Sequence, residues 1–152
     1  MLRTLAILVP LLATWPAQAE RPNLVPPGWD QVAAEPGASD RRFVSHDGTG
    51  RMIARQTKAA PGALGRDMDA LAYRDGERIT YQRRAPTWIA VSGYRGDDIF
   101  YRKSNLACGG TRWNTIELTY PRSDKRRMDA TVTAIAHRMG SYYDQCPSAE
   151  RQ

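Results

Sequence analysis

The chain has 152 residues, of which 25% are charged and 41% are hydrophobic, with 22 Lys and Arg against 16 Asp and Glu. This balance is typical of a folded globular protein and excludes a disordered or collagen-like chain. The length fits one domain and leaves no room for a second hydrophobic core.

Residues 1–19 have the pattern of a secretory signal peptide. Arg3 gives a positive start, an apolar core covers residues 5–13, and Ala17–Ala19 provides a small-residue cleavage site. The apolar core is shorter than the ~20 residues that a membrane-spanning helix needs. We therefore expect cleavage, no transmembrane span afterwards, and a periplasmic or secreted protein that does not meet nucleic acid.

Export explains the two cysteines, Cys108 and Cys146. In an oxidising compartment an even cysteine count in a small domain predicts a disulfide. Closing this loop stabilises the fold by about 4 kcal/mol in the chain-entropy model. The alternative is a nucleophilic Cys108, which needs a base beside it. His46 and His137 are the two histidines of the chain.

The N-terminal half of the mature chain predicts a lead-in, a hairpin and a helix. Residues 20–40 are rich in proline and predict an extended lead-in. Residues 42–45 and 51–57 predict two strands, joined as a hairpin by a Gly-containing turn. Residues 61–74 predict a helix, because apolar residues recur on one face at i, i+4, i+7 and i+8. These are Leu64, Met68, Leu71 and Ala72.

Four strands and a second helix are expected after that. The strands cover residues 78–83, 87–94, 98–107 and 111–120, separated by short turns, so they form an antiparallel meander. Ser123 or Asp124 is a suitable N-cap for a helix that ends near Met139, before Gly140. The buried stripe of this helix consists of Met128, Val132, Ile135 and Met139.

The element order is thus ββ-α-ββββ-α. It predicts an α+β fold in which two helices pack on a curved antiparallel sheet of about six strands. Residues 41–146 form this single domain, and residues 147–152 form a tail.

The opening Pro27-Gly-Trp29, the hairpin residues Phe43–Gly48 and the element order resemble the PsbP-like superfamily. Its founders are the extrinsic proteins of the photosystem II oxygen-evolving complex. In related sequences a Gly-Trp or similar pair precedes a strand that ends in a Ser-Pro-Asp-Gly turn, and here His46 takes the place of the proline. The resemblance covers about residues 25–140 and implies a sheet flanked by helices, with binding or assembly roles. It transfers no functional residue.

A second resemblance concerns the middle of the chain. Residues 88–94 followed by residues 99–102 are similar to a group of small exported bacterial proteins of unassigned function. A shared fold says little about function.

Metal and catalytic motifs give little support for an enzyme. With both cysteines paired, two histidines are too few for a transition-metal site, and no cofactor motif is present. Glu117 is a candidate general acid if a cleft buries it, and the alternative is a solvent-exposed carboxylate. We expect no catalytic residues, no metal and no cofactor.

A basic set of residues surrounds the start of the last predicted helix. It consists of Arg122, Lys125, Arg126 and Arg127. Free backbone N–H groups at a helix start favour an anion, so this set is a candidate site for phosphate or carboxylate. The alternative is a solvated basic face. Two arginine pairs, at residues 41–42 and 83–84, add charge at positions that the sequence does not locate in space.

An aromatic set is the second candidate. It consists of Trp88, Tyr94, Tyr101 and Trp113. Alternation along the strands puts aromatic and polar residues on one sheet face and aliphatic residues on the other. A partly exposed aromatic face suits a sugar or a protein partner. The alternative is that a helix covers it as part of the core.

Together these observations predict an exported, non-catalytic binding or accessory protein of the bacterial cell envelope. Its expected partner is an anionic envelope component or a protein. The rival hypotheses are a hydrolase of cell-wall or lipid substrates and an accessory subunit of a membrane complex.

Overall fold

The computed structural model describes residues 25–38, 40–142 and 146. The predicted signal peptide and the C-terminal tail lie outside these residues. The described elements are, in chain order, β1 (Trp29–Val32), β2 (Arg41–Ser45), β3 (Arg51–Lys58), α1 (Leu64–Ala72), β4 (Arg78–Ala85), β5 (Trp88–Arg95), β6 (Asp98–Ala107), the 3-10 turn η1 (Cys108–Gly110), β7 (Arg112–Pro121), the 3-10 turn η2 (Arg122–Asp124) and α2 (Lys125–Tyr142).

The strands form one antiparallel sheet in the order β1-β2-β3-β7-β6-β5-β4. The predicted hairpin and the predicted four-strand meander are both present. They join through β3 and β7, whose register places Ile53 opposite Glu117. The predicted α+β class is therefore confirmed.

The sheet has seven described strands rather than about six, because the lead-in contains β1. Prolines flank this segment without interrupting it, so Trp29–Val32 pairs with β2 along its whole length. The indole of Trp29 packs over Gly50, where a Cβ atom would lie only 2.8 Å from the ring. A composition rich in proline therefore concealed a short edge strand, the position in a sheet that tolerates nearby proline best.

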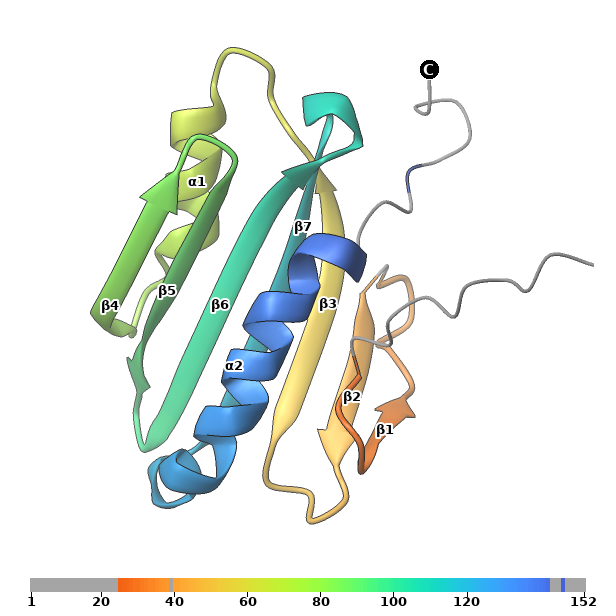
Figure 1. The fold of residues 1–152 in the computed structure, drawn as a ribbon, viewed down its shortest axis with the longest axis vertical. Coiled ribbons are helices and arrows are strands. Elements are labelled where there is room, and N and C mark those ends of the chain that lie inside the picture. Colours follow the sequence, from red (N-terminus) through yellow and green to blue (C-terminus); the bar gives the residue numbers. More distant parts are fainter. Residues whose placement is uncertain (1–24, 39, 143–145, 147–152) are drawn as a thin grey trace, which may run out of the picture.

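One helix covers each face of the sheet (Figure 1). Helix α1 packs on β5 and β6 from one side, and α2 packs on β6 and β7 from the other. The α1 core consists of Ala59, Met68, Ala72, Ile89, Val91, Phe100 and Trp113. The α2 core consists of Phe43, Met52, Ala54, Ala90, Ile99, Tyr101, Ile116, Leu118, Tyr120, Met128, Ile135 and Met139. Alternate residues of the central strands thus enter opposite cores.

The two helices have the predicted buried stripes and different ends. Helix α1 begins at Leu64, three residues after Pro61, and ends at Ala72. Helix α2 follows the 3-10 turn and continues through Gly140 to Tyr142, so Gly140 does not end it. A glycine inside a helix costs only about 1 kcal/mol relative to alanine, which tertiary packing readily offsets.

The predicted disulfide between Cys108 and Cys146 is present, with a Cα–Cα distance of 5.4 Å. It links the turn between β6 and β7 to the segment after α2. Such a bond fits an oxidising compartment. Within the described residues, no helix has the length and hydropathy needed to cross a membrane.

Candidate functional site

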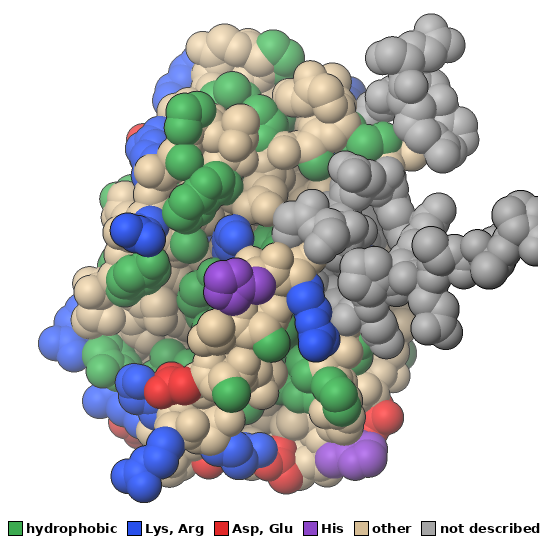
Figure 2. Space-filling view, viewed as in Figure 1, with side chains coloured by type: hydrophobic (Ala, Val, Ile, Leu, Met, Phe, Trp, Pro, Cys, Tyr) green, Lys and Arg blue, Asp and Glu red, His purple; other side chains and the backbone are tan. Residues whose placement is uncertain are grey.

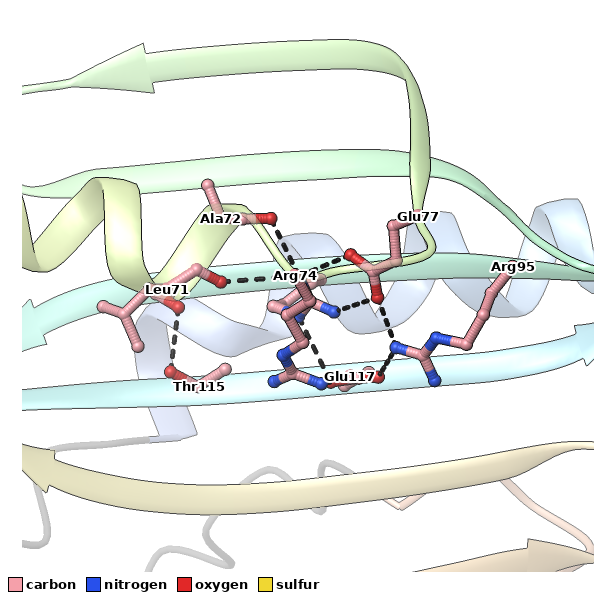
Figure 3. A network of polar contacts seen from close by, with 9 residues as sticks. Leu71, Ala72, Arg74, Glu77, Arg95, Thr115 and Glu117 are labelled. Atoms are coloured by element: carbon pink, nitrogen blue, oxygen red, sulfur yellow. Dashed lines mark hydrogen bonds and ion pairs between the residues drawn. The ribbon is translucent and has the colours of Figure 1, made fainter.

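A buried cluster of arginines and glutamates lies on the α1 side of the sheet (Figure 3). Arg102 of β6 is at its centre, and the side chains of Arg102 and Glu77 are each only 1% exposed. Arg102 Nη2 lies 2.7 Å from Glu77 Oε1, and its Nε lies 3.2 Å from Glu117 Oε2. Its Nη1 also donates to the carbonyl of Ala72 at the end of α1, over 2.9 Å. We call this cluster, with Arg74 and Arg95, the arginine–glutamate network.

Two further arginines lie on the solvent side of the arginine–glutamate network. Arg74 Nη1 lies 2.5 Å from Glu117 Oε2, and Arg95 Nη2 lies 2.9 Å from Glu117 Oε1. Arg95 also pairs with Glu77. Every carboxylate oxygen of the two glutamates therefore has an arginine partner, as buried charges require.

Glu117 is consequently ionised, and it is not the exposed carboxylate that was the alternative expectation. Burial alone would raise its pKa, but the charge and hydrogen bond of Arg102, helped by Arg74 and Arg95, outweigh burial and lower the pKa to about 2. A general acid must hold a proton near the working pH. Glu117 carries no proton at neutral pH. It therefore fits a structural role, in which its charge is paired with the surrounding arginines.

The predicted basic set is only partly free to bind an anion. Lys125 Nζ lies 3.0 Å from Asp129, and Arg127 Nη2 lies 2.8 Å from Asp47 and 2.6 Å from Asp124. Arg126 is exposed and forms no hydrogen bond or ion pair with another described residue. In Figure 2, acidic and basic side chains are intermixed at the end of the molecule where α2 begins, as these ion pairs require.

The predicted aromatic set is divided between the two cores. Trp113 is 1% exposed, lies on the α1 side, and donates from Nε1 to Asp67 over 3.0 Å. Tyr101 is buried on the α2 side, and burial raises its pKa to about 12, with a smaller contribution from Tyr81. Trp88 and Tyr94 pack at the margin of the α2 core and stay half-buried. The four residues therefore do not form one exposed surface.

The basic and aromatic sets meet at Tyr94. The guanidinium carbon of Arg122 lies 4.2 Å from the centroid of the Tyr94 ring, and that of Arg78 lies 5.0 Å from the same centroid. Lys103 Nζ lies 5.4 Å from the centroid of the Trp88 ring. All these distances are within the range of cation–π attraction.

These residues share the α2 side of β4, β5 and β6, next to α2. The strand pairing places Arg83 opposite Ala90, and Ala90 opposite Lys103. It also places Arg78 opposite Tyr94. We call this surface the cation–aromatic face; it consists of Arg78, Tyr81, Arg83, Trp88, Tyr94, Lys103 and Arg122.

A bulge in β4 sets the position of Arg78 and Tyr81 on this face. The register shifts between Ile79 and Tyr81, so both Arg78 and Tyr81 end on the α2 side although they are three residues apart. Gly93 permits this arrangement, because a Cβ atom there would lie 2.0 Å from the carbonyl oxygen of Arg78. A side chain at Gly93 would therefore displace β4.

The cation–aromatic face carries positive charge without acidic partners. No acidic residue lies in β4 or β5, and Asp98 of β6 shares its side of the strand with Phe100 of the α1 core. Among the described residues, no carboxylate pairs with Arg78, Arg83, Lys103 or Arg122. Lys103 Nζ donates to the carbonyl of Ala136, and Arg122 Nη2 donates to the carbonyl of Gly96. In Figure 2, basic side chains lie among hydrophobic ones along the side formed by β4 and β5.

Several residues of the cation–aromatic face are not predicted as binding residues from the sequence. Arg83 was noted without a location, whereas Arg78, Tyr81 and Lys103 were not considered as binding residues. The available signal was the absence of Asp and Glu from the two neighbouring strands β4 and β5, combined with alternation along each strand. The bulge that adds Arg78 to the face has no clear local signature.

Comparison with known proteins assigns no family, since no protein-family model and no curated protein sequence matches the chain. Within the described residues, no three His, Cys, Asp or Glu side chains are grouped so as to hold a metal ion. Functional inference therefore depends on the cation–aromatic face itself.

Proposed function

We propose that this is an exported, non-catalytic binding protein of the bacterial cell envelope, and that its cation–aromatic face holds an anionic component. The observation that carries the proposal is the placement of two guanidinium groups, of Arg78 and Arg122, against the single ring of Tyr94. Neither group has a carboxylate partner among the described residues.

The Tyr94 ring supports anion binding by restricting both arginines. A free arginine side chain loses up to ~2 kcal/mol of rotamer entropy when it is fixed. Stacking on Tyr94 removes part of that loss before the ligand arrives. The planar fork of donors then fits a carboxylate or phosphate bidentately.

Export is the second part of the proposal. The disulfide supports it, and so does the signal-like sequence of residues 1–19. The PsbP-like fold remains a hypothesis that agrees with the observed structure at the level of the α+β class. An accessory role in a larger envelope assembly is compatible with that hypothesis and would use the same face.

Calorimetric titration of the mature chain with polygalacturonate tests the binding site. The double variant Arg78→Gln/Arg122→Gln should lose most of the affinity, and raised salt should weaken binding to the native chain. Neutral dextran should not bind. The matched control is Lys125→Gln/Arg127→Gln. It also removes two positive charges, but from one lysine and one arginine that already have acidic partners.

The control also decides between this site and the predicted basic set. Equal loss in both double variants would mean that net charge, not this face, drives binding. Loss in the control alone would place the anion at the start of α2. Either result contradicts the proposal, as does binding that neither variant changes.

A further inference from the structure

The cations of the cation–aromatic face form two pairs along β5. Arg83 and Lys103 flank Ala90 on the two neighbouring strands, and Arg78 and Arg122 meet at Tyr94. Ala90 and Tyr94 are four residues apart on one strand, which corresponds to about 13 Å. Two separate positive sites therefore lie along one line.

The positions between the two cation pairs are neutral and carry hydroxyl groups. The strand pairing places Tyr81, Ser92 and Tyr101 side by side in that row. Tyr81 is 48% exposed and offers a flat ring beside a hydroxyl group. The order along the face is thus positive, neutral, positive.

The surroundings of the face favour a narrow ligand over a flat one. Helix α2 packs on β6 and β7 and rises beside the cation–aromatic face, while β4 is the open edge of the sheet (Figure 1). Lys103 marks the inner border, since its Nζ donates to the carbonyl of Ala136 in α2. A planar bilayer would meet α2 first, whereas a single chain can lie along β5 beside the helix.

From this pattern we infer that the anionic component is a linear acidic polysaccharide whose acidic groups are separated along the chain by neutral sugar. This inference rests on the proposed function and specifies its ligand. Two acidic groups of one chain would occupy the Arg83/Lys103 pair and the Arg78/Arg122 pair. The intervening sugar would lie on Tyr81, where an exposed aromatic ring and hydroxyl groups can meet the apolar and polar sides of a sugar ring.

Nucleic acid matches this spacing less well. It carries a phosphate about every 3.4 Å along each strand, which is much denser than the two cation pairs. Phosphates between the two cation pairs would then lie over Tyr81 and Ser92, which offer no positive charge.

The test is a length series of hyaluronan oligosaccharides, in which each uronic acid is followed by a neutral N-acetylglucosamine, titrated from the disaccharide upward against the native mature chain. We expect weak binding of the shortest members and a rise of about a hundredfold once one chain spans both cation pairs. Arg78→Gln/Arg122→Gln and Arg83→Gln/Lys103→Gln should each abolish that rise and leave weak binding that no longer depends on length. Circular dichroism verifies that both variants remain folded, and Lys125→Gln/Arg127→Gln should keep the rise.

The outcomes separate this inference from the proposed function. Binding that does not strengthen with length, or inorganic phosphate binding as tightly as the longest oligomer, overturns the polysaccharide inference and leaves a single anion site. Binding to anionic phosphatidylglycerol vesicles without binding to the hyaluronan oligosaccharides also overturns it. If none of these probes binds, both proposals fail.

Discussion

The two sides of the sheet use arginine in opposite ways. On the α1 side, Arg102 is surrounded by two glutamates and a backbone carbonyl, and little of it reaches solvent. On the α2 side, Arg78 and Arg122 lie on an aromatic ring at the surface without a carboxylate partner among the described residues. On the α1 side both glutamates are paired with arginines inside the protein, whereas the two arginines at Tyr94 on the α2 side have no carboxylate partner among the described residues.

This difference predicts opposite consequences for stability and binding. Removing one member of a buried ion pair leaves its partner charged and desolvated, which costs several kcal/mol. Removing an exposed cation costs little, because water solvates what remains. Substitutions in the arginine–glutamate network should therefore lower the free energy of unfolding by several kcal/mol, and substitutions on the cation–aromatic face should impair binding with a smaller loss of stability.

The largest effect is expected for Arg102→Met. It leaves Glu77 and Glu117 buried without their central partner, so the free energy of unfolding should fall by about 3–5 kcal/mol. Urea denaturation measures this change. A loss below ~1 kcal/mol would show that the arginine–glutamate network contributes no more than surface charge pairs.

Loss of the disulfide should have a similar effect through a different mechanism. The bond between Cys108 and Cys146 closes a loop that contains β7 and α2. Cys108→Ser/Cys146→Ser should lower the free energy of unfolding by about 4 kcal/mol in the chain-entropy model. Urea denaturation under oxidising conditions compares the free energy of unfolding of the native chain with that of the double variant. Equal values would contradict a structural role for the bond.

Acid should destabilise the protein through Glu117. Its pKa is lowered from 4.5 to about 2 in the folded chain, so the unfolded chain takes up its proton first as the pH falls. The stabilisation is fully present above pH 4.5 and is lost between there and about pH 2. It amounts to at most about 3 kcal/mol. Denaturation midpoints of the native chain and Glu117→Gln should converge over this pH interval, and a constant difference would refute the assignment.

The smallest effect on stability is expected for Arg78→Gln/Arg122→Gln. Both side chains are exposed, and the cation–π contacts with Tyr94 are worth about 0.5–1 kcal/mol each. Thermal denaturation should detect a decrease of no more than about 2 kcal/mol. A larger loss would mean that the cation–aromatic face is structural.

Local patterns in the sequence were sufficient for most of the fold. Alternation and turn residues predicted the hairpin, the meander and the helix stripes, because each depends on neighbouring residues. The edge strand β1 was missed because prolines surround it. The close packing of Trp29 over Gly50, which accompanies β1, is a contact between distant positions.

The candidate site was harder to predict for the same reason. Arg122 was expected to face an anion at a helix start, and it stacks on Tyr94 of another strand. Glu117 alternates with core residues in a pattern that fits exposure or burial equally. Its burial depends on Arg102 from β6 and Arg74 from the loop after α1. Sequence patterns specify which side of a strand a residue occupies, but not which side chains converge on it from elsewhere.

The binding role of the cation–aromatic face is tested most directly by titrating the isotope-labelled chain, expressed from Glu20 onward, with polygalacturonate and following the backbone amides by two-dimensional NMR. We expect the chemical shift changes to concentrate in β4, in β5 and at Arg122, while the amides around Arg102 and Glu77 stay unchanged. Shifts confined to the first turn of α2, shifts around the arginine–glutamate network, or the absence of any shift would contradict it.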